Sequence, residues 1–186
     1  MKLLDEYEIP FNGLNEEIHE FSFKAGPGFF DFFQNPDFTS GNLEVMIMLI
    51  KKPVFLELKF NISGTIRLLC DRCLEEFDHP ISVKELLIIK LGDKFEELDN
   101  EVIMIPREET RINVAQYIYE FAILSLPFRK IHPESGCNPE MLRKIKELNN
   151  DTYKDIDPRW DKLKKIVLNK NKNGTSKKKN IPDKEG

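Results

Sequence analysis

Apolar and polar side chains alternate along several stretches in the first half of the chain, a pattern typical of strands that bury one face. In residues 18–23, for example, Phe21 and Phe23 fall on one side and Glu20 on the other. The stretches with alternating or aliphatic character are residues 7–11, 18–23, 43–50, 54–60, 65–69, 81–91 and 101–106. We therefore expect a mainly antiparallel sheet, whose first two strands are joined by a hairpin turn at residues 12–15.

The apolar spacing becomes helical in the second half of the chain. From Val114 to Leu124 apolar side chains recur every three or four residues, with Asn113 as the expected N-cap and Pro127 beyond the end. Further helical segments are expected at residues 28–34, 139–149 and 157–168. The predicted fold class is α+β, in which one or two helices cover a mainly antiparallel β-sheet.

Length and composition indicate a single domain with a tail. The chain has 186 residues, 40% of them hydrophobic, which is enough for one core over residues 1–168 and a basic, disordered tail over residues 169–186. No apolar run is long enough to span a membrane, and the acidic N-terminus lacks the apolar region of a signal peptide. We expect a cytoplasmic protein whose cysteines are reduced.

Charge is distributed unevenly along the chain. The formal net charge is −4, yet residues 159–179 hold nine basic side chains and one acidic side chain. A lysine-rich tail on an acidic body either contacts a polyanion or is simply a solvated terminus. The sequence leaves both alternatives open.

Two short motifs supply the candidate chemistry. Cys70 and Cys73 are separated by two residues, and His132 and Cys137 by four. Three thiolates and an imidazole in two close pairs form the donor set of a tetrahedral zinc site. Four protein ligands leave no open coordination position, so we predict a structural zinc. Because the first pair lies between two predicted strands, this Cys/His knuckle would join the tip of a β-hairpin to the C-terminal segment.

Other interpretations of these residues are weighed beside the zinc site. Buried cysteines also act as small apolar side chains, and His79 is a rival fourth ligand. A thiol redox enzyme would use Cys70 and Cys73 beside Arg72, but such a pair normally begins a helix that lowers the thiol pKa. The sequence has no glycine-rich phosphate loop, Gly-x-Ser-x-Gly or His-Glu-x-x-His. We therefore expect neither an enzyme nor a small-molecule substrate.

The same motifs carry a family resemblance. Cys70-Asp71-Arg72-Cys73-Leu74 is followed in order by Leu124-Ser125-Leu126-Pro127, by the motif from His132 to Cys137, and by Asp157-Pro158-Arg159-Trp160-Asp161-Lys162-Leu163. Together they resemble the YceD family of large ribosomal RNA subunit accumulation proteins. The blocks Ile9–Leu14 and Phe21–Phe23 look like the Bacteroidetes branch of that family.

The resemblance implies a non-enzymatic ribosome-biogenesis factor that supports the accumulation of 23S rRNA. Family members are often encoded beside the gene for a large-subunit ribosomal protein, which fits that role. The implied partner is large-subunit rRNA or a large-subunit ribosomal protein. With a protein partner, the chain would be an interaction module whose acidic face binds a basic protein. The candidate phosphate-binding or partner-binding residues are Arg72, Arg129, Lys130, Lys177, Lys178 and Lys179.

Overall fold

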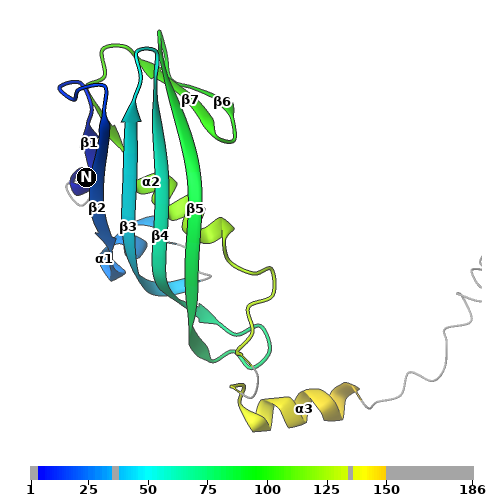
Figure 1. Cartoon of the computed structure of the whole chain (residues 1–186). Coiled ribbons are helices and arrows are strands. Elements are labelled where there is room, and N and C mark those ends of the chain that lie inside the picture. The colour runs from blue at the N-terminus through cyan, green and yellow to red at the C-terminus, as the bar shows by residue number, and fades with distance from the viewer. Residues whose placement is uncertain (1–3, 35–37, 134–135, 150–186) are drawn as a thin grey trace, which may run out of the picture. The chain divides into compact units, whose positions relative to one another are not determined.

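The computed structural model describes residues 4–34, 38–133 and 136–149 (Figure 1). Its strands are β1 (Glu8–Pro10), β2 (Ile18–Ala25), β3 (Phe38–Lys51), β4 (Phe55–Leu69), β5 (Glu76–Gly92), β6 (Glu96–Asp99), β7 (Val102–Pro106) and β8 (Arg111–Asn113). Its helices are α1 (Pro27–Phe33), α2 (Ala115–Leu124) and α3 (Pro139–Asn149), with a 3-10 turn at Asp5–Tyr7. The predicted α+β class is confirmed. The helix expected at residues 157–168 and the basic tail lie outside the described residues.

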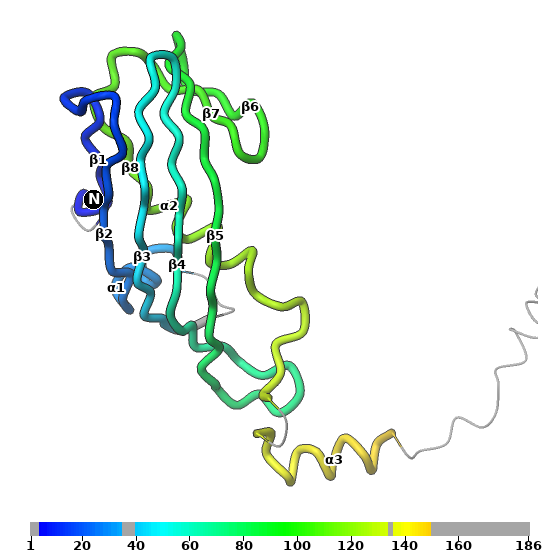
Figure 2. The backbone as a smooth tube through the Cα atoms, viewed as in Figure 1, coloured from blue at the N-terminus to red at the C-terminus, as the bar shows by residue number. Residues whose placement is uncertain are grey.

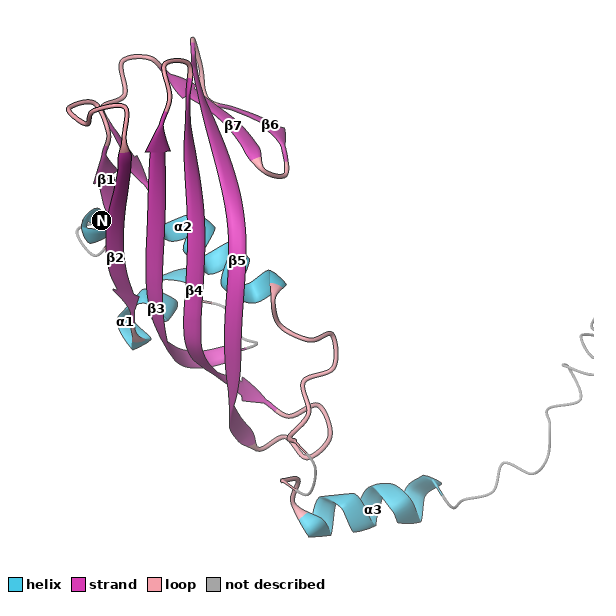
Figure 3. Cartoon of the chain, viewed as in Figure 1, coloured by secondary structure: helices cyan, strands magenta, loops and turns pink. Residues whose placement is uncertain are grey.

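Six strands form one sheet in the order β2-β3-β4-β5-β7-β6. Neighbouring strands are antiparallel except β5 and β7, which run parallel. The β4–β5 pairing is continuous from Phe55 opposite Lys90 to Leu69 opposite Glu76. This long hairpin carries the connection at residues 70–75, and with it the Cys-x2-Cys motif, to one end of the sheet (Figure 3).

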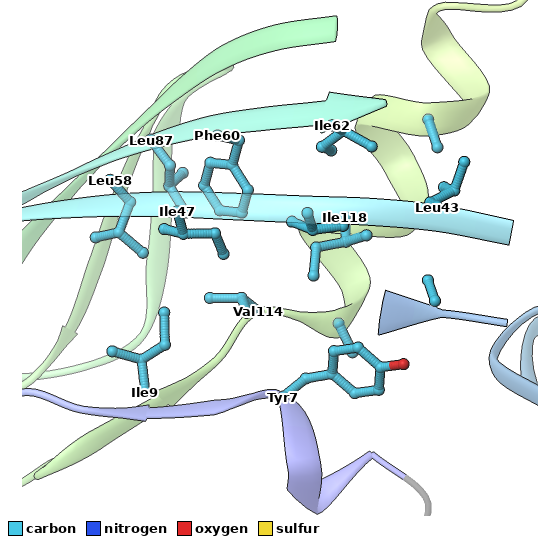
Figure 4. Packing of buried hydrophobic residues seen from close by; sticks show 14 of the residues in the cluster. Tyr7, Ile9, Leu43, Ile47, Leu58, Phe60, Ile62, Leu87, Val114 and Ile118 are labelled. Carbon is cyan, nitrogen blue, oxygen red and sulfur yellow. The ribbon is translucent and has the colours of Figure 1, made fainter. Parts of the chain in front are cut away.

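One face of the sheet is packed against α2, and the core lies between them (Figures 3 and 4). The alternation along the strands decides which side chains face inward. Ile47, Phe60 and Leu87 from the three central strands pack in one cluster with Ile118 of α2. The helix α2, whose apolar residues recur at helical spacing, thus covers this face of the sheet.

Tyr7 is the main polar group at the edge of this core. Its hydroxyl donates a hydrogen bond of 2.8 Å to the backbone oxygen of Lys24. Burial raises the pKa of the Tyr7 phenol to about 12, and the nearby charge and hydrogen bond of Glu6 act in the same direction. The hydroxyl therefore stays protonated and anchors the N-terminal segment to β2.

The predicted hairpin between residues 7–11 and 18–23 is wrong. β1 pairs instead with β8, where Ile9 lies opposite Ile112, and Figure 2 shows these two strands side by side. β2 pairs with β3 along its full length of eight residues. The longer pairing forms more ladder hydrogen bonds, and the Lys51 ammonium holds the intervening turn by donating to the backbone oxygens of Phe11, Asn12 and Leu14.

The chain divides into two compact units, residues 1–142 and 143–186. The first unit holds both sheets, α1, α2 and the first residues of α3, whereas α3 from Arg143 onward belongs to the second. The expected domain boundary at residue 168 stays a prediction. Among the helices that the structure describes, none has the length and apolarity needed to cross a membrane.

Candidate metal centre

The connection between β4 and β5 folds into a turn that aims two thiols inward. The backbone N–H of Cys70 donates to the oxygen of Glu75 at 3.0 Å, and that of Leu74 donates to the oxygen of Cys70 at 2.9 Å. These bonds close the turn, and both Cys70 and Cys73 are buried. Leu74 has a left-handed backbone with φ of 61°, a conformation that glycine adopts without strain and leucine does not.

A second segment, described at residues 128–133 and 136–142, is fastened to this turn by hydrogen bonds on both sides of residues 134–135. Asp71 and Lys130 bond reciprocally, because the N–H of Asp71 donates to the Lys130 backbone oxygen and the N–H of Lys130 donates to Asp71 Oδ2, each at 2.7 Å. The Asn138 amide donates to Glu75 Oε1 at 2.7 Å. We call these two contacts, Asp71–Lys130 and Glu75–Asn138, the latch.

Asn138 also starts α3 and so fixes where Cys137 lies. Its Oδ1 accepts hydrogen bonds from the N–H groups of Glu140 at 2.9 Å and Met141 at 3.5 Å, which is the role of an N-cap residue. Pro139 occupies the first position of the helix, where its missing N–H costs nothing. The residue just before the cap, Cys137, is held in the buried space beneath the turn.

The structure brings Cys70, Cys73, His132 and Cys137 together, with one donor atom of each lying within 4.8 Å of all the others. The Cys70 and Cys137 sulfurs are 3.7 Å apart, and His132 Nδ1 lies 3.4 Å from Cys73 Sγ and 3.7 Å from Cys137 Sγ. Around one tetrahedral zinc ion, two sulfurs are separated by about 3.8 Å and a sulfur and a nitrogen by about 3.6 Å. The donor spacing therefore fits a zinc ion, and it is far too long for a disulfide.

The electrostatics of the cluster favour a cation at its centre. Burial raises the pKa of the Cys70 thiol, but N–H groups of Cys73, His132 and Arg72 and the His132 side chain outweigh it and lower that pKa to about 6. Burial raises the pKa of Cys137, as do its hydrogen bonds to the sulfurs of Cys70 and Cys73 and their charges. A second thiolate is therefore costly beside the first unless a metal ion neutralises both.

An apolar shell surrounds the donors. Phe77, Ile131, Met141 and Leu142 pack against the three cysteines. The Phe77 ring lies with its centroid 4.7 Å from that of His132 and so restricts the imidazole. Such a shell excludes water and holds ligand rotamers, as a permanent metal site requires.

The other sequence-based alternatives fare differently. His79, the rival ligand, is half-buried beside Phe77 and is not among the four clustered donors. Cys70 and Cys73 lie in a strand-to-strand turn, so no helix N-terminus assists either thiol, as it does in thiol redox enzymes. The latch itself was not predicted, because nothing in the sequence near Asp71 or Asn138 reveals a partner some sixty positions away.

The predicted phosphate-binding residues fall into two groups. Arg72 on the β4–β5 turn and Arg129 on the second segment are both exposed. Lys130, whose backbone forms part of the latch, is half-buried. The latch brings the two segments that carry them to the same end of the sheet. Lys177, Lys178 and Lys179 lie outside the described residues, so their role stays a prediction.

Comparison with protein families gives a match over the second part of the chain. The family model described as "Large ribosomal RNA subunit accumulation protein YceD" matches residues 58–167, more than half of the chain. The matched segment contains all four residues of the cluster, the latch and α2. Neither the curated proteins nor the solved structures include a match to this chain.

Proposed function

Because the chain belongs to the YceD family of large ribosomal RNA subunit accumulation proteins, we propose that it is a non-enzymatic, cytoplasmic ribosome-biogenesis factor. In this proposal it supports the accumulation of 23S rRNA, and thereby of the large ribosomal subunit. The observation that carries the proposal is the family match over a segment that includes the whole Cys/His cluster. The assignment to the Bacteroidetes branch stays a prediction from the N-terminal blocks.

The cluster is proposed to hold a structural zinc through Cys70, Cys73, His132 and Cys137. Donor distances that match a tetrahedral ion support this, as does the low pKa of Cys70. Four protein donors fill the coordination sphere, so the metal would organise the fold and leave no position for a substrate. When bound, it would fix residues 128–142 to the β4–β5 turn together with the latch.

RNA contact is proposed for Arg72 and Arg129, with the lysine tail as a second contact. The two guanidinium groups belong to segments that the latch and the metal hold together, and both side chains are exposed. Phosphate contacts by such residues release counterions, so binding weakens steeply as salt rises. Arg72→Gln with Arg129→Gln is expected to reduce the slope of log affinity against log salt by about 1 for each phosphate that is no longer neutralised. Arg107→Gln, at an exposed arginine after β7, removes one positive charge away from the cluster and serves as the control, in which the slope is expected to stay unchanged.

A protein partner is the second candidate, and the charge of residues 1–149 favours it. Residues 1–149 carry 26 acidic and 17 basic side chains, which disfavours broad contact with a phosphate backbone and suits a basic ribosomal protein. An RNA partner and a protein partner require different binding surfaces. RNA binding requires the arginines near the cluster or the tail, whereas protein binding requires an acidic or apolar surface elsewhere.

Affinity purification of the tagged full chain from cell lysate, with and without RNase, tests the proposal. The expected result is co-purification of large-subunit rRNA or large-subunit proteins above the level of an unrelated acidic protein. Loss of all partners after RNase indicates RNA-borne association, and retention indicates a protein partner. Recovery of neither rRNA nor ribosomal protein, with normal rRNA levels in cells lacking the chain, contradicts the proposed function.

A further inference from the structure

The outer face of the sheet, which α2 does not cover, carries an apolar patch. In Figures 1 and 3 this face of β2–β5 is turned toward the viewer, with α2 behind it. The solvated face of an antiparallel sheet is normally polar. Here Ile18 and Met46 are 60% and 51% exposed, and further large apolar side chains share the face. The half-buried members are Met48, Ile50, Leu86 and Ile88.

Strand register gathers these residues in neighbouring rows across the sheet. One row runs Ile18, Ile50, Glu57 and Ile88, and the next runs Glu20, Met48, Lys59 and Leu86. In each row the apolar side chains flank a charged residue of β4, Glu57 or Lys59. Single exposed apolar residues are ordinary, but apolar side chains gathered in neighbouring rows mark a contact surface. Methionines suit such a surface because their flexible thioethers adapt to a partner.

The patch includes a groove that crosses four strands. Its volume is about 620 Å³, and it extends from Glu20 on β2, past Met46 and Met48, to Leu86 on β5 and Glu101 before β7. Four neighbouring strands at their usual spacing span about 14 Å, which is the length of about ten residues of α-helix. A short amphipathic segment therefore matches the groove in length.

The negative charges at the two ends of the groove favour a positively charged partner. Glu20 and Glu101 are exposed, and in the described part of the chain neither forms an ion pair. Of the lining lysines, Lys59 is paired with Glu57 at 3.0 Å, which leaves Lys84 as the unpaired cation among the described lining residues. Carboxylates at both ends repel phosphate and attract lysine or arginine. No aromatic ring is exposed along the groove, within the described residues, to stack on a base.

We propose that this groove binds a basic amphipathic segment of a protein partner, with apolar side chains on Met46, Met48 and Leu86 and cationic side chains at Glu20 and Glu101. The inference rests on the protein-partner form of the proposed function, and it names the surface and the chemistry of the ligand. It is independent of the Cys/His cluster, whose residues lie on the β4–β5 turn and on the second segment that the latch fastens to it.

Fluorescence anisotropy with a labelled helical peptide tests the groove. The probe has leucines on one face and lysines near both ends, and the control peptide has glutamates in place of the lysines. The zinc-loaded full chain is expected to bind the basic probe at least about tenfold more tightly than the acidic control. Met46→Lys with Leu86→Lys is expected to weaken binding by about tenfold or more, because apolar surface is removed from the groove and a like charge is added.

Matched variants separate the groove from general charge effects. Val54→Lys, at a position 73% exposed on the β3–β4 turn, adds one lysine outside the groove, where the groove variant adds two inside it, and is expected to leave affinity almost unchanged. Glu20→Gln with Glu101→Gln is expected to weaken binding several-fold and to reduce its salt dependence. Thermal unfolding of each variant confirms that the sheet is intact.

Several results would overturn the proposal. Equal affinity for both peptides, or equal effects of the groove and Val54 variants, would show that the groove is not the site. A dimer that the groove variant dissociates would show that a second copy covers this face. A single-stranded RNA that loses affinity in the groove variant would assign the surface to RNA. If the groove fails while purification still recovers ribosomal components, the proposed function stands and only the docking surface is wrong.

Discussion

Replacing Cys137 with serine is expected to weaken the attachment of residues 136–142 to the β4–β5 turn. Cys137 is 6% exposed, and its sulfur lies 3.7 Å from both Cys70 Sγ and His132 Nδ1. If the site held no metal, the substitution would cost only the burial of one thiol, about 1–2 kcal/mol. With zinc bound by four donors, the loss rises to several kcal/mol, because the free energy of metal binding is also free energy of folding.

Denaturant unfolding followed by circular dichroism, with added zinc and with chelator, separates these cases. Chelator is expected to lower the free energy of unfolding of the wild type by about 3 kcal/mol or more, and to change that of Cys137→Ser very little. Ile118→Val, at a buried position of α2, serves as the control and is expected to cost about 1 kcal/mol in both conditions. A loss of equal size with and without chelator for Cys137→Ser would refute the reasoning.

Amide hydrogen exchange shows which part of the chain loses stability when the metal site is disrupted. The N–H groups of Asp71 and Lys130 are bonded within the latch, so they are expected to lose protection when Cys137 is replaced or zinc is removed. The N–H groups at the centre of β3, near Ile47, are expected to keep theirs, because α2 and the neighbouring strands still cover them. Unchanged exchange at the latch would show that the metal does not hold the two segments together.

The remaining predictions concern the backbone and the core. Leu74→Gly is expected to raise the free energy of unfolding by about 0.5–1 kcal/mol, because φ of 61° strains a leucine. A lower free energy of unfolding in denaturant titration would show instead that the Leu74 side chain stabilises the turn. Gly64→Ala is expected to cost about 3 kcal/mol or more, because φ is +149° and an added Cβ would clash with the Asn42 carbonyl oxygen; an unchanged unfolding midpoint would contradict this. Burial raises the pKa of Tyr7 to about 12, so the folded state favours the neutral phenol. Its contribution to stability is complete below the unfolded-state pKa of about 10 and is lost as pH rises toward 12. Tyr7→Phe should flatten that fall in unfolding experiments across this pH range, and an unaltered pH dependence would contradict the assignment.

Local periodicity predicts the central strands because buried and exposed side chains alternate along each of them. In β4 the inward side chains such as Leu58 and Phe60 are buried, whereas Lys59 between them is exposed. The helix α2 was predicted for the same reason, and Asn113 Oδ1 accepts a hydrogen bond from the Ala115 N–H near its start. Such features depend on neighbours within a few residues, which the sequence displays directly.

Long-range pairing explains what the sequence did not reveal. β1 and β8 have three residues each and lie about a hundred positions apart, so no local pattern distinguishes this pairing from the expected hairpin. The strand β6 shows no apolar alternation, because all four of its residues are exposed. The latch residues Asp71 and Asn138 find partners only after the chain has folded.

The cluster shows both the reach and the limit of motif-based prediction. Its four members were predicted from spacing, and the structure brings them together with separations that suit a tetrahedral ion. The lowered pKa of Cys70 was not predictable, because it depends on N–H groups contributed by both segments. The apolar outer face was not predictable either, because the sequence does not reveal which face of the sheet α2 covers.

The metal content of the full chain, purified without chelator and measured by elemental analysis, tests most directly whether the Cys/His cluster binds zinc. We expect close to one zinc per chain in the wild type, a strongly reduced content in Cys137→Ser and an unchanged content in Ile118→Val. A wild-type protein that is folded and carries only a small fraction of one zinc would show that the cluster is not a zinc site. The four residues would then be a buried thiol and imidazole cluster that stabilises the fold without a metal.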